Sequence, residues 1–182
     1  MGVCVFGGSA NRNNNKMGDF DIIELNRLCV NDGLEVNILS FFVASCLKLL
    51  PPPLIVISYA DPNVGHHGYI YQATNWMYLG QGQRMDGGWD SGVTLFEKDG
   101  KQYHAKTVSS LIGGASKDIA EKNGFTRLFL KPKHKYCYFI GNKSQKKKMM
   151  QQLKYKIMPY PKGDNMRYDS SFNPTIQLSL LI

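Results

Sequence analysis

Chemically versatile side chains are concentrated between Ser58 and Trp76, where a carboxylate, two imidazoles, three phenols and an indole occur within 19 residues. Asp61, His66 and Tyr71 are five residues apart in each step, so a tight turn can bring them together. Oxygen and nitrogen donors of this kind suit iron or manganese better than a structural zinc ion. The spacing allows a metal site, but equally a catalytic or substrate-binding cluster without metal, or ordinary turn capping beside packed aromatic rings.

The residues around this trio are candidates for binding a substrate. They are aromatic or polar side chains of the same segment, namely Tyr59, His66, Tyr69, Asn75 and Trp76. Each has a structural alternative as well. Asp61 can cap a helix, because carboxylates favour helix N-termini, and the rings of Tyr69 and Trp76 can simply pack in the core.

Two further candidates precede this segment. Arg27 is a lone cation within an apolar and acidic strand, and its planar guanidinium can hold a substrate phosphate or carboxylate. The alternative is an ion pair with Glu24 or Asp32. Ser40 falls near a helix N-terminus, where free backbone N–H groups bind anions, although such a serine can also do no more than complete the first turn.

Length and composition restrict the class of protein. A chain of 182 residues with 43% hydrophobic and 20% charged residues fits one globular domain and excludes a disordered chain, a collagen-like fibre and a coiled coil. The longest apolar stretch, residues 38–50, is too short to span a membrane. No secretory signal is recognised, so we expect a cytoplasmic protein. The four cysteines match neither a zinc site nor a disulfide framework.

The net positive charge of the chain lies in its last third. Residues 1–125 carry 10 basic and 12 acidic side chains, whereas residues 126–182 carry 12 basic and 2 acidic ones. Lysines interleaved with tyrosines are typical of nucleic-acid binding, because lysines pair with phosphates and aromatic rings stack on bases. A solvated basic face and another anionic partner remain open. The candidate DNA-binding residues are Lys133, Lys135, Lys146, Lys147 and Lys148.

The pattern of apolar residues predicts alternating strands and helices. Strands are expected at residues 3–6, 20–30, 54–57, 127–130 and 136–140, and a hairpin within residues 80–107. Helices are expected from the N-cap Asn37 to the prolines at 51–53, and over residues 67–77, 109–122 and 144–153. This order favours an α/β fold with a mixed sheet, in which ligands gather beyond the carboxyl ends of strands. Asp61 lies at such an end.

Several of these segments together resemble a known family. Glu24-Leu-Asn-Arg27-Leu, Ser40-Phe, Ser58-Tyr-Ala-Asp61, Gly65-His66 and Gly68-Tyr-Ile-Tyr71-Gln-Ala-Thr-Asn75-Trp76, followed by Lys133-His-Lys-Tyr136 and Tyr160-Pro-Lys162-Gly, are similar to the phage Mom family of DNA adenine-modifying proteins. The resemblance runs from about residue 2 to residue 163. It implies one domain over residues 1–163 and a tail over residues 164–182.

The resemblance implies a fold and an activity. The family adopts an N-acetyltransferase (GNAT) type fold, a mixed sheet flanked by helices, and converts adenine in phage DNA to an N6-carbamoylmethyl derivative that defeats host restriction. Asp61 and Tyr71 match positions regarded as essential, and iron is associated with that centre, so the implied metal ligands are Asp61, Tyr71 and His66. Arg27 and Ser40 match residues near the donor or substrate pocket.

Two departures from the family pattern keep other functions open. Residues 31–36 lack the features of acetyl-CoA users, so an ordinary acetyl-CoA donor is not expected. We also expect the chain to lack the first N-terminal strand and helices of the family. The alternatives are a catalytically inactive or truncated DNA-binding remnant and a small-molecule N-acyltransferase. For an enzyme acting on double-stranded DNA, the base must leave the stack and enter an aromatic pocket, while the basic last third holds the backbone.

Overall fold

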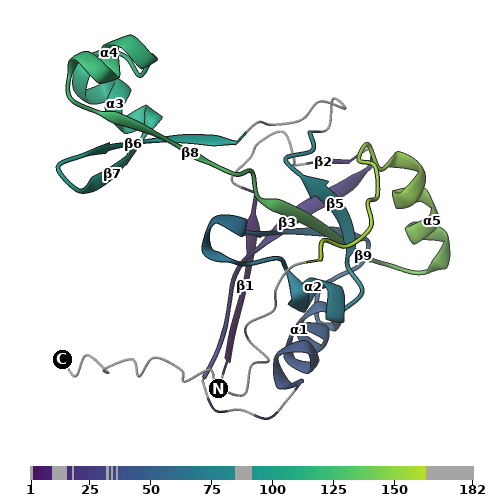
Figure 1. Ribbon diagram of the computed structural model, residues 1–182. Coiled ribbons are helices and arrows are strands. Elements are labelled where there is room, and N and C mark those ends of the chain that lie inside the picture. Colours follow the sequence, from purple (N-terminus) through teal and green to yellow (C-terminus); the bar gives the residue numbers. More distant parts are fainter. Residues whose placement is uncertain are drawn as a thin grey trace.

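The computed structural model describes residues 2–9, 16–17, 19–31, 33, 35, 37–84 and 92–162, which form a main sheet, a smaller second sheet and the helices packed on them (Figure 1). The strands of the main sheet follow the order β1, β3, β4, β9 and β5, and β2 pairs with β3. Their bounds are β1 (Gly2–Gly8), β2 (Lys16–Met17), β3 (Phe20–Val30), β4 (Leu54–Ala60), β5 (Met77–Gln81) and β9 (His134–Ile140).

Strands β3 and β4 are parallel and are joined through helix α1 (Ile38–Lys48). A parallel pair needs such a crossover, and the prolines at 51–53 end the helix before β4 begins. The other neighbouring pairs of the main sheet are antiparallel. The predicted α/β class with a mixed sheet flanked by helices is therefore confirmed. Its assignment to the GNAT type stays a prediction.

Both faces of the main sheet are covered, which explains the unbroken apolar run of β4. On one face, Val56 packs with Val43 of α1 and with Tyr71 of the short helix α2 (Tyr69–Ala73). On the other face, Ile55 packs with Met149 of helix α5 (Lys143–Gln152). Because successive strand residues point to opposite faces, a side chain on β4 belongs to either the α1–α2 face or the α5 face.

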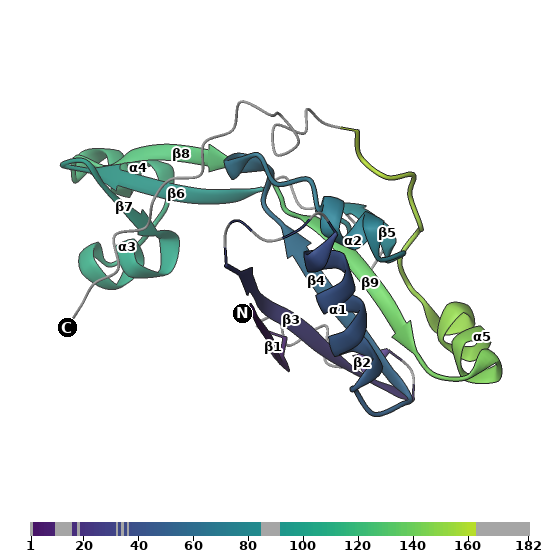
Figure 2. The same cartoon turned by 90° about the horizontal axis from the view of Figure 1, so that it is seen from below.

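The second sheet lies between β5 and β9 in sequence and projects away from the main sheet (Figure 2). It has the strand order β7, β6, β8, with bounds β6 (Val93–Lys98), β7 (Lys101–His104) and β8 (Thr126–Leu130). Helices α3 (Ala105–Ile112) and α4 (Lys117–Lys122) pack on it, and Phe96, Val108, Ala120 and Phe125 form their shared core. This unit has its own hydrophobic centre and joins the main sheet beside the end of β4.

Three local predictions differ from the structure. The helix expected over residues 67–77 stops at Ala73, and Met77 begins strand β5, because Asn75 takes a left-handed conformation with φ 60°. The helix expected over residues 109–122 is two helices, since Gly113, with φ 77°, ends α3. Asn37 occupies the N-cap position of α1 but also has a positive φ, and its side chain makes no capping hydrogen bond.

Some predictions fall on residues outside the described ranges. The tail over residues 164–182 belongs to this group, and the boundary at residue 163 stays a prediction. Within the described ranges, no helix combines the length and the apolar character needed to cross a membrane.

Candidate active site

Asp61 follows β4 directly and organises the turn that comes after it. It is the N-cap of a short 3₁₀ helix, Pro62–Val64, and its Oδ1 accepts hydrogen bonds from Asn63 N at 2.9 Å and Asn63 Nδ2 at 2.8 Å. Partial burial alone would raise the pKa of Asp61, but the Asn63 hydrogen bonds and the charge of Lys133 outweigh it and lower that pKa below its ordinary value of 3.8. Asp61 is therefore a carboxylate at neutral pH.

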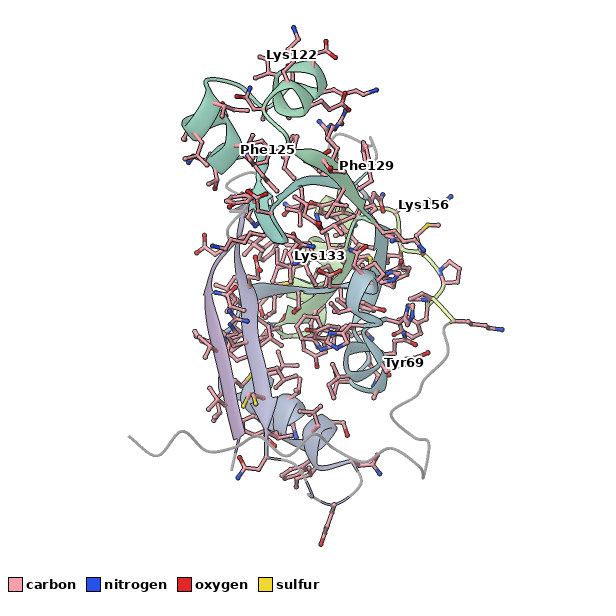
Figure 3. All side chains as sticks on the ribbon, turned by 60° about the vertical axis from the view of Figure 1, so that its left-hand side comes forward. Tyr69, Lys122, Phe125, Phe129, Lys133 and Lys156 are labelled. Carbon is pink, nitrogen blue, oxygen red and sulfur yellow. The ribbon has the colours of Figure 1, made fainter. Side chains whose placement is uncertain are left out.

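Lys133 is the charged partner of this carboxylate. Its Nζ lies 3.6 Å from Asp61 Oδ2, and the two side chains are 56% and 28% exposed. A pair this exposed contributes little to stability. Its importance is chemical, because it keeps a cation beside the carboxylate at the junction of the two sheets, where Figure 3 places Lys133.

Asn63 ties this turn to the segment between β8 and β9. Its Nδ2 donates to the Lys131 carbonyl oxygen at 2.9 Å, and its Oδ1 accepts from Lys131 N at 2.9 Å. One amide side chain thus pairs with both main-chain groups of Lys131 while also contacting Asp61. No local pattern of residues predicts this role of Asn63, because its partner is 68 positions away in the sequence.

A cavity of about 230 Å³ opens beside Asp61, between the main sheet and the second sheet. Its lining consists of Asp61, Asn63, Leu95, His104, Leu130, Lys131 and Lys133. Leu95 is directly opposite His104 on β7, and Leu130 follows two residues after Leu128, which is also opposite Leu95. These side chains share one face of the second sheet, and α3 and α4 cover the other.

Tyr71 lies in the core on the α1–α2 face and does not line this cavity. It is 8% exposed, its hydroxyl oxygen is 2.7 Å from Ser58 Oγ, and that Oγ is 3.0 Å from the Leu25 carbonyl oxygen. A carbonyl only accepts, so Ser58 donates to Leu25 and Tyr71 donates to Ser58. Burial raises the pKa of Tyr71, which keeps the phenol protonated.

The three residues predicted to bind iron do not converge in this arrangement. The Tyr71 oxygen is enclosed beside Ser58, whereas the Asp61 oxygens contact Asn63 and Lys133 outside the core. His66 is exposed, and its backbone N–H donates to the Asp61 carbonyl at 3.0 Å. Among the described residues, no three His, Cys, Asp or Glu side chains are grouped to hold one ion. As placed, Asp61, His66 and Tyr71 do not fit a single iron ion.

A cluster of tyrosines and histidines packs beside Tyr71. Tyr136 donates to the His67 carbonyl oxygen, and the Tyr78 hydroxyl is 2.7 Å from His134 Nδ1. Burial, followed by the charge of His67, lowers the pKa of His134, so its imidazole is neutral and accepts from Tyr78. Gly68 packs directly on the Tyr136 ring with φ 76°. This cluster fixes the start of α2 and explains the glycine there.

The other predicted substrate-binding residues have separate positions. Trp76 is fully buried, with its ring centroid 5.1 Å from that of Tyr71, which is the packed position considered for it, and its role in substrate binding stays a prediction. Tyr69 is half-buried and packs edge-on against His67. Tyr59 is half-buried on the α5 face, and Asn75 is exposed in the turn before β5.

Arg27 and Ser40 lie near the same edge of the main sheet as Asp61. Glu24 on β3 pairs with Ile57 on the parallel strand β4, so Arg27 and Asp61 both lie toward the carboxyl ends of these neighbouring strands. Arg27 is exposed, which rules out the buried ion pair considered for it. Ser40 Oγ donates to the Asn37 carbonyl at 2.8 Å and so completes the first turn of α1.

The predicted DNA-binding lysines divide into three groups. Lys133 is exposed beside the cavity, and Lys146, Lys147 and Lys148 are exposed on α5. These two groups lie at opposite ends of β9, a strand of seven residues and about 20 Å. Lys135 is only 7% exposed, and its Nζ donates to Tyr155 at 3.0 Å and lies 5.5 Å from the Tyr59 ring centre. Lys135 is therefore buried and does not belong to the exposed basic surface.

Comparison with known proteins agrees with the family resemblance. The sequence model of the Mom protein family matches residues 1–162. Methylcarbamoylase mom of Escherichia phage Mu is 28% identical over 145 residues, which cover 77% of this chain and 56% of the phage Mu protein. This chain thus spans little more than half the length of that relative. With a match over all of its described residues, the chain belongs to the Mom protein family.

Proposed function

We propose that this protein is a DNA-modifying enzyme that converts adenine to an N6-carbamoylmethyl derivative. Membership of the Mom family and the name of the phage Mu relative, a methylcarbamoylase, support the proposal. The reaction joins the adenine N6 nitrogen to the methylene carbon of the transferred group. The nitrogen loses one proton, and the leaving group departs from the donor with the bonding electrons.

The ionised carboxylate of Asp61 is the observation that carries this proposal. It lies at the carboxyl end of β4, borders a cavity and is held in place by Asn63. A carboxylate accepts hydrogen bonds, so it can orient the adenine amine and take the proton that the nitrogen releases. The lowered pKa of Asp61 keeps it ionised at neutral pH, so it can accept a hydrogen bond from the amine.

The exposed lysines supply the electrostatic attraction that an enzyme acting on double-stranded DNA requires. Lys133 and the three lysines of α5 lie at the two ends of β9, about 20 Å apart. That separation corresponds to about six base pairs of duplex at 3.4 Å per step. We propose that DNA lies along the direction of β9, with the cavity at one end of the contact. We also propose that Arg27 binds the group donor, because it is exposed toward the same strand ends as Asp61.

Mass spectrometry of nucleosides from plasmid DNA tests the function directly. Cells express the wild-type chain, the Asp61→Asn variant, or the Asp118→Asn variant as a matched control, because Asp118 is an exposed carboxylate of α4 remote from the cavity. We expect a heavier adenosine with the wild type and the control, and its loss with Asp61→Asn.

A parallel binding measurement separates catalysis from DNA affinity. All three proteins should bind plasmid DNA with the same steep dependence on salt, because Asp61 contributes no positive charge. Unmodified adenine from a folded, DNA-binding wild type would contradict the proposal and identify a DNA-binding protein without this activity. Full modification by Asp61→Asn would contradict the role of the carboxylate.

A further inference from the structure

The far wall of the cavity beside Asp61 belongs to the second sheet. Leu95 and Leu130 contribute apolar surface, and His104 contributes an imidazole at the point where β7 ends and α3 begins. None of these three positions is close in sequence to Asp61. The second sheet thus forms the wall of the cavity opposite to the main sheet and faces the Asp61 carboxylate.

The size of the cavity limits what can enter it. Pockets for typical small-molecule ligands measure about 300–1,000 Å³, whereas this cavity measures about 230 Å³. A single flat ring system matches this volume better than a nucleotide-sized donor does. The two leucines offer the apolar surface against which such a ring packs.

The polar groups of the cavity complement adenine. Asp61 Oδ1 already accepts two hydrogen bonds from Asn63, whereas the contact of Oδ2 within the described part of the chain is the ion pair with Lys133 at 3.6 Å, which leaves acceptor capacity for an amine. Lys131 and Lys133 are exposed at the rim, where they can contact the phosphates that flank a displaced nucleotide. His104 offers either a donor or an acceptor to the ring nitrogens.

The second sheet is fixed against the main sheet at this point. Asn63, in the turn after β4, pairs with both main-chain groups of Lys131, which directly follows Leu130 at the end of β8. The wall that carries Leu130 is therefore held at a defined distance from Asp61. A preformed slot of this kind can receive a base without paying to order its own walls.

We propose that this cavity receives the adenine extruded from the double helix, packed against Leu95 and Leu130, with His104 contacting its polar edge. The inference rests on the proposed function and adds the location of the reacting base. Enzymes that act on a base must take it out of the stack, and here the second sheet provides the pocket in place of the aromatic pocket expected from the sequence.

Disulfide trapping tests where the base lies. A duplex carries an adenine with a thiol tethered through a short alkyl chain to N6, and the full chain carries either His104→Cys or Gln102→Cys. Both residues are exposed on β7, but only His104 lines the cavity. We expect the His104→Cys variant to cross-link much faster than the Gln102→Cys variant and the wild type, whose own cysteines provide the background. Equal rates for the two variants would overturn the inference.

A fluorescence measurement tests the extrusion itself. Duplexes in which 2-aminopurine replaces one adenine brighten when that base is unstacked, so binding of the wild-type chain should raise the emission. No rise at saturation, or no binding to these duplexes, would overturn the inference. The nucleoside measurement tests the proposed reaction separately from the pocket. Modified adenine together with equal cross-linking rates refutes only the pocket. Selective cross-linking without modified adenine refutes only the proposed reaction.

Discussion

Replacing Asn63 with alanine removes the contact that connects the Asp61 turn to the second sheet. The side chain makes three hydrogen bonds, two with the main chain of Lys131 and one with Asp61. A hydrogen bond contributes about 0.5–1.5 kcal/mol net, and Asn63 is exposed, so values near the lower end apply. We expect Asn63→Ala to lower the free energy of unfolding by about 2 kcal/mol, which corresponds to a fall in melting temperature of about 4–8 °C for a chain of this size.

Local opening is measured more directly by hydrogen exchange. The backbone N–H of Lys131 donates to Asn63 Oδ1 in the wild type. Loss of this acceptor should speed exchange of that amide about tenfold or more, since about 1.4 kcal/mol corresponds to a factor of ten. Asn123→Ala is the matched control, because Asn123 is also exposed but its side chain bonds only within its own helix, to the Ile119 carbonyl.

The variant Asn63→Asp tests the effect of a negative charge beside Asp61 in addition to the loss of hydrogen bonds. It keeps an acceptor for the Lys131 N–H, loses both donated bonds, and sets a second carboxylate beside Asp61, which should raise the pKa of Asp61. We expect Asn63→Ala and Asn63→Asp both to lose DNA modification. An Asn63→Ala protein that melts with the wild type, exchanges its Lys131 amide at the wild-type rate and modifies DNA fully would refute it.

Three further predictions concern the neighbouring core and the carboxylate. Gly68→Ala should cost about 3 kcal/mol in a denaturant titration, because it combines a left-handed backbone with overlap on the buried Tyr136 ring; an unchanged midpoint would contradict the packing described. Tyr71→Phe should cost about 1 kcal/mol, the value of its hydrogen bond with Ser58, and a much larger loss would show that the phenol has another partner. The folded pKa of Asp61 lies below its unfolded value, so the stability difference between wild type and Asp61→Asn should be fully present above pH 3.8 and disappear as the pH falls through the lowered pKa. A difference that grows on acidification would reverse the sign and refute the assignment.

The order of elements could be predicted from the sequence because it depends on local patterns. The apolar run that precedes Asp61 predicts a strand buried on both faces, and β4 is such a strand. Strand β5 escaped prediction because it is five residues long and follows directly on α2. The positive φ of Asn75 separates the two elements, and a single left-handed residue leaves no periodic signal.

The site could be predicted only in part, because its geometry depends on which face each side chain takes. The position of Asp61 at a strand end follows from local pattern, but regular spacing to Tyr71 did not bring the two together. Lys133 and Lys135 are two residues apart and share a face, yet only Lys135 is buried, since Tyr155 from beyond α5 covers it. Such coverage depends on long-range packing that spacing alone does not encode.

The central position of β9 has a consequence for synthesis on the ribosome. Strand β5 emerges well before β9 but has no partner in the main sheet until β9 inserts between it and β4. Lys133 precedes β9 directly, so its approach to Asp61 depends on the same event. A nascent chain that stops short of residue 140 therefore exposes the apolar flank of β4 and lacks the enclosed carboxylate. Such fragments should aggregate rather than act on DNA, which confines activity to chains whose translation has passed this strand.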